Sequence, residues 1–177
     1  MEKLKAILKC MYRTRFKTDK IELVVWSDLK RLFKSNQWRY GIFETDRMIT
    51  ATFEIAENRG NDYYIAVYDK EIHFRVKVLE DFDAERTVEL FILAAHFNNL
   101  LNQGTVVVNV ESKYVEYHLK SDSFSALYYP DTLYYKLINH YNTSKDIYWG
   151  FHQLIEMNEE PVFIISEILK RNSTDRA

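Results

Sequence analysis

The chain has 177 residues, of which 47% are hydrophobic and 28% charged, and this length is enough to bury one ordinary core. Its formal net charge of -2 excludes a strongly basic nucleic-acid binder and an acidic disordered tail. Four glycines and two prolines argue against linkers, and a single cysteine excludes an internal disulfide, which favours a reducing, cytoplasmic location.

Residues 1–18 predict a basic amphipathic helix. Its apolar residues recur at helical spacing and are Leu4, Ile7, Leu8, Met11 and Tyr12. Its other face carries Lys3, Lys5, Lys9 and Arg13. Seven Lys or Arg residues oppose two acidic residues up to position 20, so this arm is about +5 and the remainder about -7. Such a helix packs on its own domain, on a partner subunit or on an anionic membrane surface, and an apolar stripe usually faces a core.

A second helix is predicted over residues 19–35. Asp19 is placed to cap it, and Glu22 three residues later completes a capping-box pattern. The predicted buried stripe consists of Ile21, Val25, Leu29, Leu32 and Phe33. The β-branched residues within 21–26 lose side-chain freedom in a helix, so a short strand there is the alternative.

Residues 38–82 predict an antiparallel meander of at least three strands. Apolar and polar residues alternate through most of this stretch, which is typical of strands with one covered and one solvated face. Turn signals at 57–62 and 69–71 separate the strands.

The stretch 83–118 indicates an α+β fold. Asp83 caps a predicted helix that ends near Gln103, and Gly104 stands where a left-handed C-cap is expected. One face of this helix carries Val88, Phe91, Ile92, Ala95 and Asn99. Three amides near its end, Asn98, Asn99 and Asn102, are predicted to bond free carbonyls or the backbone of a neighbouring strand rather than a ligand. Strands over 105–110 and 114–119 follow as a hairpin.

The C-terminal part is predicted to be helical. One helix opens at Pro130 and runs to about Met157, with a possible break at 142–144, and a shorter helix starts at Pro161. Residues 171–177 form a polar tail. We therefore expect a single domain over 19–170, in which helices cover one face of an antiparallel sheet of about five strands.

Tyrosine is unusually frequent, with 13 in the chain and eight of them between residues 114 and 148. Tyr readily fills half-buried positions at the edge of a core, and an aromatic binding surface is the alternative. The candidate partner-binding residues are Tyr114, Tyr117, Tyr128, Tyr129 and Tyr134, together with Leu4, Ile7, Leu8 and Met11 on the N-terminal helix.

Motifs that carry chemistry are absent from the sequence. It contains no Gly-rich phosphate loop and no G-x-S-x-G, H-E-x-x-H or C-x-x-C motif. No two of the five His residues have the i, i+4 spacing of a helical metal site, and Cys10 is interpreted as an apolar filler. No apolar run reaches the roughly 18–20 residues of a membrane span. We expect no catalytic residues, no metal, no cofactor, no nucleic-acid partner and no stable membrane insertion.

The run Ala95-x-x-Asn98-x-x-Leu101-Asn102-x-Gly104, followed by Val106-x-Val108 and Tyr114-x-x-Tyr117, resembles the YbjN family, which is labelled as bacterial sensory transduction regulators. Residues 161–165 are similar to the closing segment of that family, and the resemblance covers about 19–169. It implies a secretion-chaperone-like α+β sandwich that often dimerises and holds a partner chain. The family has no established catalytic residues to carry over, and the basic N-terminal helix and the many tyrosines depart from it.

The expected function is that of a non-enzymatic, chaperone- or adaptor-like module that binds a protein partner of unknown identity and forms a homodimer. An apolar helix or strand of the partner would be buried against an exposed sheet edge or aromatic surface. The alternative is a small-molecule-sensing regulatory domain with a ligand between sheet and helices. An enzymatic function is the weakest hypothesis, because no nucleophile, metal or acid/base set is visible.

Overall fold

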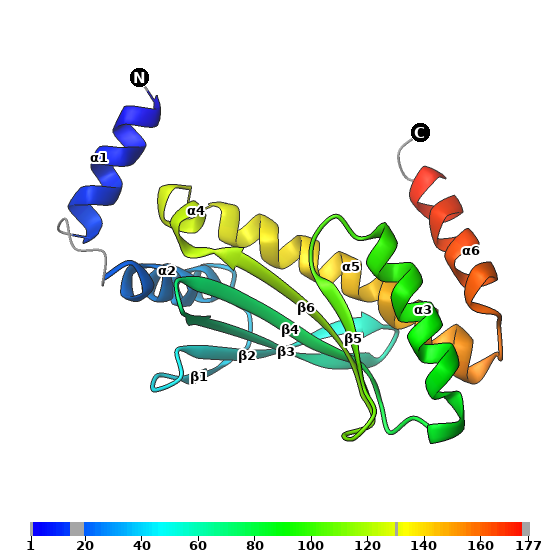
Figure 1. The fold of residues 1–177 in the computed structure, drawn as a ribbon. Coiled ribbons are helices and arrows are strands. Elements are labelled where there is room, and N and C mark those ends of the chain that lie inside the picture. Colours follow the sequence, from blue (N-terminus) through cyan, green and yellow to red (C-terminus); the bar gives the residue numbers. More distant parts are fainter. Residues whose placement is uncertain (1, 15–19, 130, 175–177) are drawn as a thin grey trace. The chain divides into compact units, whose positions relative to one another are not determined.

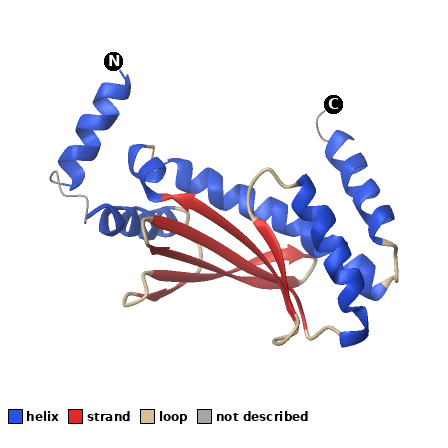
Figure 2. Ribbon diagram, in the orientation of Figure 1, coloured by secondary structure: helices blue, strands red, loops and turns tan. Residues whose placement is uncertain are grey.

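The computed structural model describes residues 2–14, 20–129 and 131–174 (Figures 1 and 2). The elements follow one another in the order α1 (Glu2–Thr14), α2 (Ile21–Ser35), β1 (Gly41–Phe43), β2 (Met48–Ala56), β3 (Arg59–Tyr68), β4 (Glu71–Glu80), the 3-10 turn η2 (Ala84–Arg86), α3 (Thr87–Leu100), β5 (Thr105–Asn109), β6 (Tyr114–Asp122), α4 (Ser123–Tyr128), α5 (Asp131–Glu156) and α6 (Pro161–Thr174). The predicted α+β class is confirmed.

The described strands form one antiparallel sheet of six strands with the order β1-β2-β3-β4-β6-β5. At one edge Gly41 pairs with Thr50, and at the other Thr105 pairs with His118. The sheet has one strand more than the sequence predicts, because the three residues of β1 are too few to show an alternating pattern. Buried and exposed side chains alternate along β3 and β6, as expected for a sheet with one covered face.

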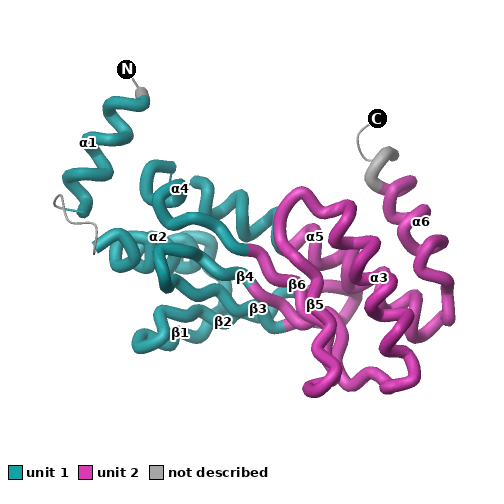
Figure 3. Tube along the Cα trace, viewed as in Figure 1, with its two compact units in different colours: residues 1–53, 62–74, 120–140 teal, residues 54–61, 75–119, 141–177 magenta. Residues whose placement is uncertain are grey.

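The contacts divide the chain into two compact units (Figure 3). Unit 1 comprises residues 1–53, 62–74 and 120–140, and unit 2 comprises residues 54–61, 75–119 and 141–177. The division passes through the middle of β2, β3, β4, β6 and α5, so these elements contribute residues to both units.

In unit 1, residues 21–35 form the helix α2 and not the alternative strand. Its buried side chains include Ile21, Val25, Leu29 and Phe33 from the predicted stripe, whereas Leu32 is half-buried. Burial of this stripe outweighs the weak helix preference of the β-branched residues. Asp19, the predicted cap, lies outside the described residues.

The capping-box partner predicted for Glu22 is Asp19, which the structure does not describe. Among the described residues the Glu22 carboxylate accepts hydrogen bonds from the Arg47 guanidinium and, at 2.9 Å, from the backbone N–H of Lys70. Asp69 and Lys70 both have positive φ, as a two-residue hairpin turn between β3 and β4 requires. The predicted turn at 69–71 is thus confirmed, and Glu22 connects it to α2.

In unit 2, Asp83 acts as the predicted cap, and its carboxylate accepts a hydrogen bond from the Glu85 N–H at 3.2 Å. The cap opens η2, and α3 begins only at Thr87 and ends at Leu100, three residues before the predicted end. Leu101 leaves the helix in an extended conformation, so no left-handed cap forms. Gly104 does have φ of +84°, but it serves the turn into β5, which corrects its predicted place as the C-cap.

Helix α5 runs unbroken from Asp131 to Glu156, so the possible break at residues 142–144 does not occur. The Ser144 hydroxyl donates to the Tyr141 carbonyl at 2.7 Å, which turns its polar atom back onto the helix. Helix α6 continues to Thr174 and so includes the first residues of the predicted polar tail.

The replacement Gly104→Ala tests the turn between α3 and β5. A Cβ at this position would lie 2.6 Å from Cε2 and 2.7 Å from the hydroxyl of Tyr117, and Ala disfavours a positive φ. We expect a loss of about 2–4 kcal/mol in the free energy of unfolding, measured by urea denaturation. Gly60→Ala is the matched control, because Gly60 is exposed and only Gly104 has positive φ among the described glycines. Equal losses in both variants would contradict this explanation.

Candidate interaction surfaces

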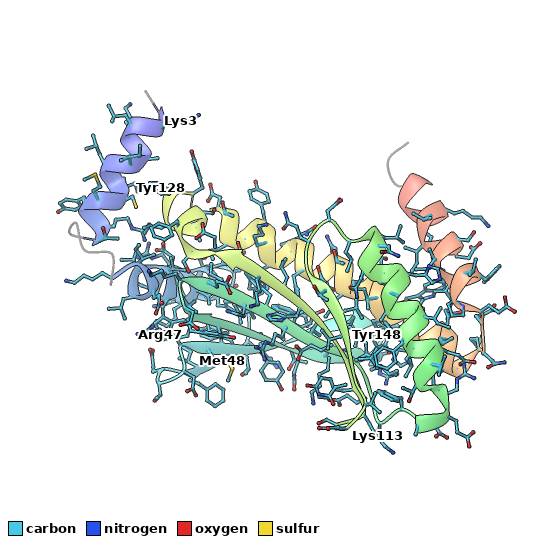
Figure 4. All side chains as sticks on the ribbon, in the orientation of Figure 1. Lys3, Arg47, Met48, Lys113, Tyr128 and Tyr148 are labelled. Atoms are coloured by element: carbon cyan, nitrogen blue, oxygen red, sulfur yellow. The ribbon has the colours of Figure 1, made fainter. Side chains whose placement is uncertain are left out.

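Helix α1 attaches to unit 1 through contacts with α2 and α4. The buried side chains on its contacting side are Cys10 and Thr14, and the Arg13 guanidinium forms an ion pair with the buried carboxylate of Asp28 on α2. The Cys10 thiol is in hydrogen-bond contact with Tyr128, which projects from α4 (Figure 4). Burial raises the pKa of Cys10, and the Tyr128 hydroxyl and the Arg13 charge oppose this effect.

The predicted apolar stripe of α1 lies on a different side of the helix from this attachment. Leu4 and Leu8 are 61% and 57% exposed, and Ile7 and Met11 are also exposed. The expectation that the stripe faces a core is therefore not met among the described residues. The helix forms as predicted, but its contacts with the rest of unit 1 are made by Cys10, Thr14 and the ion pair of Arg13 with Asp28.

The five candidate tyrosines do not share one surface. In unit 2, Tyr117 is fully buried and its hydroxyl donates to the Gln103 carbonyl at 3.0 Å, while Tyr114 is half-buried with the Lys77 ammonium 4.9 Å from its ring centroid. The spacing of three residues on one strand already places these two side chains on opposite faces of the sheet. Tyr117 belongs to the core of unit 2.

The remaining three candidate tyrosines belong to unit 1. Tyr128 is half-buried at the attachment of α1, whereas Tyr129 and Tyr134 are exposed. The Tyr134 ring stacks on Trp38 with centroids 6.4 Å apart. Tyr134 is thus held in place by an aromatic neighbour and still presents an accessible side, which suits an anchor at the edge of a core.

Helix α3 carries an exposed apolar face, whose residues the sequence grouped together without indicating that they are exposed. Leu90, Leu93, Ala94 and Phe97 are buried, and they form its inner face. The opposite side, here called the α3 outer face, consists of Val88, Phe91, Ile92, Ala95 and Asn99. Val88, Phe91 and Ile92 are 68%, 48% and 45% exposed.

The composition of α3 is unusual for a helix with one side in water. Glu89 is the one Asp, Glu, Lys or Arg among its 14 residues, and the Arg86 side chain pairs with it. A surface helix normally carries charged residues on its outer side. The sequence pattern correctly groups the five outer-face residues, but both sides of the helix are apolar, so periodicity alone cannot tell which side is buried.

Strand β5 is an edge of the sheet and packs beside α3. The Val106 N–H donates to Asn98 Oδ1 at 2.7 Å, and Asn98 Nδ2 donates to the Val106 carbonyl at 3.0 Å. The amide therefore occupies both outward backbone groups of one edge residue. This confirms the prediction that an Asn near the end of the helix bonds the backbone of a neighbouring strand, and it blocks the strand edge at Val106.

The described residues contain no group of three or more His, Cys, Asp or Glu side chains that could hold a metal ion. Among these same residues, no helix has the length and apolar character needed to cross a membrane. The sequence matches no family model, no curated protein and no solved structure. The function is therefore inferred from the exposed surfaces of the two units.

The replacement Asn98→Ala removes both hydrogen bonds to Val106. We expect a loss of about 1–2 kcal/mol in the free energy of unfolding, because two edge groups exchange a protein partner for water. Asn99→Ala on the next helix position is the matched control, since Asn99 is exposed and should change stability little. Urea denaturation measures the free energy of unfolding of both variants. Equal losses would show that the two hydrogen bonds between Asn98 and Val106 do not stabilise the fold.

The ion pair between Arg13 and Asp28 is expected to control access to Cys10. Asp28→Asn removes the charge that holds Arg13, so α1 should detach more often and the thiol should react about tenfold faster with a thiol-specific reagent. Asp46→Asn makes the same charge change at an exposed position and is the control. Equally slow labelling of both variants would contradict a docking role for the pair.

Proposed function

We propose that this protein is a non-enzymatic, protein-binding module and that it forms a homodimer through the α3 outer face. The observation that carries the proposal is the exposure of Val88, Phe91 and Ile92 on a helix with a single charged residue. Covering such a face removes apolar area from water and stabilises the covered state by about 25 cal/mol for each Å². A protein surface of matching apolar character is the partner that this face fits.

A second copy of the chain is the first occupant to consider. A two-fold interface brings the same patch together from both subunits, so that a patch without charge meets no like charge across the axis. Ala95 lies between Phe91 and Asn99 on the outer face and leaves space for a large side chain of a facing helix. Two such helices can approach to the usual 8–10 Å between axes.

Helix packing is favoured over strand addition as the mode of binding. A partner strand would need free backbone groups at a sheet edge. At β5 the side chain of Asn98 occupies those of Val106, and at the other edge β1 has only three residues. Short and blocked edges are the usual protection against strand pairing.

The chaperone- or adaptor-like character is the part of the proposal that rests on the resemblance to the YbjN family. The residues that carry this resemblance include Asn98 and Gly104, which have structural roles beside α3. In this proposal the homodimer is the form that binds a further protein, and the exposed Tyr129 and Tyr134 are candidate contacts of unit 1 with it.

The double replacement Val88→Ser with Ile92→Lys tests the dimer. Each subunit would bring a lysine into an apolar interface, so the dimer dissociation constant should rise by about 100-fold or more. The fold should persist, because both positions are exposed and Lys favours helices. Sedimentation equilibrium of the wild type should give the mass of a dimer, and that of the variant the mass of a monomer with an unchanged circular dichroism spectrum. The melting temperature of the variant should no longer depend on protein concentration.

The matched control is Val162→Ser with Phe163→Lys on α6, where the two side chains are 65% and 51% exposed. This variant should remain dimeric. A wild type that stays monomeric at about 100 μM, far above the dissociation constants of ordinary dimers, would overturn the homodimer. A dimer that persists in the α3 variant would show that the α3 outer face is not its interface.

A further inference from the structure

We propose that α1 binds anionic membrane surfaces, lying parallel to the lipid–water interface with its apolar stripe toward the acyl chains. This activity is separate from the proposed dimer, because the two use different helices in different units. The inference rests on two observations. The attached residues of α1, its apolar stripe and the pair Lys5 and Lys9 lie on different sides of the helix, and its exposed lysines form no ion pair among the described residues.

Helix α1 has three different sides at 100° per residue. The attached side carries Cys10 and Thr14, which are buried against unit 1. The second side is the exposed apolar stripe of Leu4, Ile7, Leu8 and Met11. The third side is basic, so the helix remains amphipathic toward solvent while it is attached to its own unit.

Two lysines of α1 border the apolar stripe on the side of Leu8, namely Lys5 and Lys9. Lys3 lies in the same sector of the helix as Cys10 and Thr14, but nearer the N-terminus. All three are exposed, and none forms an ion pair among the described residues. Figure 4 shows Lys3 extending from the N-terminal part of α1. Arg13, in contrast, is paired with Asp28 and contributes to attachment.

An apolar stripe bordered by lysines is complementary to an anionic lipid surface, where acyl chains lie beneath phosphate groups. Tyr12 stands at the border of the stripe and is 82% exposed, a position that suits its apolar ring and polar hydroxyl at such an interface. The 13 residues of the helix extend about 20 Å, which is too short for the roughly 30 Å hydrocarbon core, so the helix lies in the plane.

A second copy of α1 is a poorer occupant of the same stripe. Two stripes placed face to face would bring two sets of Lys5 and Lys9 together, and like charges repel. A lipid surface removes this objection, because its phosphate groups supply negative charge.

The test is co-sedimentation of the full chain with vesicles of pure phosphatidylcholine or of equal parts phosphatidylcholine and phosphatidylglycerol. The wild type should sediment with the anionic vesicles, remain free of the neutral ones and dissociate as salt is raised. Lys3→Gln, Lys5→Gln and Lys9→Gln together should weaken partition by about tenfold or more, and Leu4→Ser with Leu8→Ser by a similar factor.

The matched charge control replaces three exposed lysines outside α1 by Gln, namely Lys34, Lys113 and Lys145. It changes the net charge by the same amount and should bind as the wild type does. Lys113 lies at the turn between β5 and β6 (Figure 4). Equal weakening in both lysine variants, or no wild-type binding to anionic vesicles, would overturn the proposal.

The two proposals fail separately. The monomeric variant Val88→Ser with Ile92→Lys should keep its preference for anionic over neutral vesicles. If Leu4→Ser with Leu8→Ser instead dissociates the dimer and no variant binds vesicles, the apolar stripe of α1 is a protein interface and the lipid assignment is wrong.

Discussion

The organisation of unit 2 depends on the burial of the α3 inner face. Leu90, Leu93 and Phe97 are buried, and α3 contacts β5 and α6. The Phe97 ring stacks on Phe151 of α5 with centroids 5.8 Å apart. Because this packing sets the rotation of α3, it also decides that Asn98 reaches the edge of β5 and that the opposite apolar face remains in water. The burial of the α3 inner face thus both stabilises unit 2 and leaves the α3 outer face exposed.

Helix α1 shows the same relation in unit 1. The contact through Cys10, Thr14 and the ion pair of Arg13 with Asp28 uses a side of the helix that looks unremarkable in the sequence. Small side chains permit a close approach, and a charged partner at Asp28 fixes the register. The more apolar stripe of α1 remains exposed to solvent. Like the α3 outer face, it is therefore available to bind a partner, and each of the two proposals concerns one of these exposed helix faces.

Local patterns predicted much of the fold. The alternation in the meander, the turn at 69–71, the Asp83 cap and the hairpin of β5 and β6 all depend on residues close together in the chain, and each was found. The sequence did not predict features that depend on contacts between residues far apart in the chain. Glu22 bonds Arg47 and Lys70, which are distant in the sequence, and α3 ends at Leu100, three residues before the predicted end, where Leu101 is already extended.

Local periodicity and charge were enough to predict the α+β class, the five longer helices, the grouping of residues on their faces and the basic character of α1. They did not predict the short helix α4. Packing between distant segments settles which apolar face is covered, that Tyr117 is core while Tyr129 and Tyr134 are exposed, and that Asn98 closes the edge of β5 at Val106. The reason is physical: a helix that is apolar on two sides has no internal preference between them, and the choice depends on which neighbours pack more tightly against it.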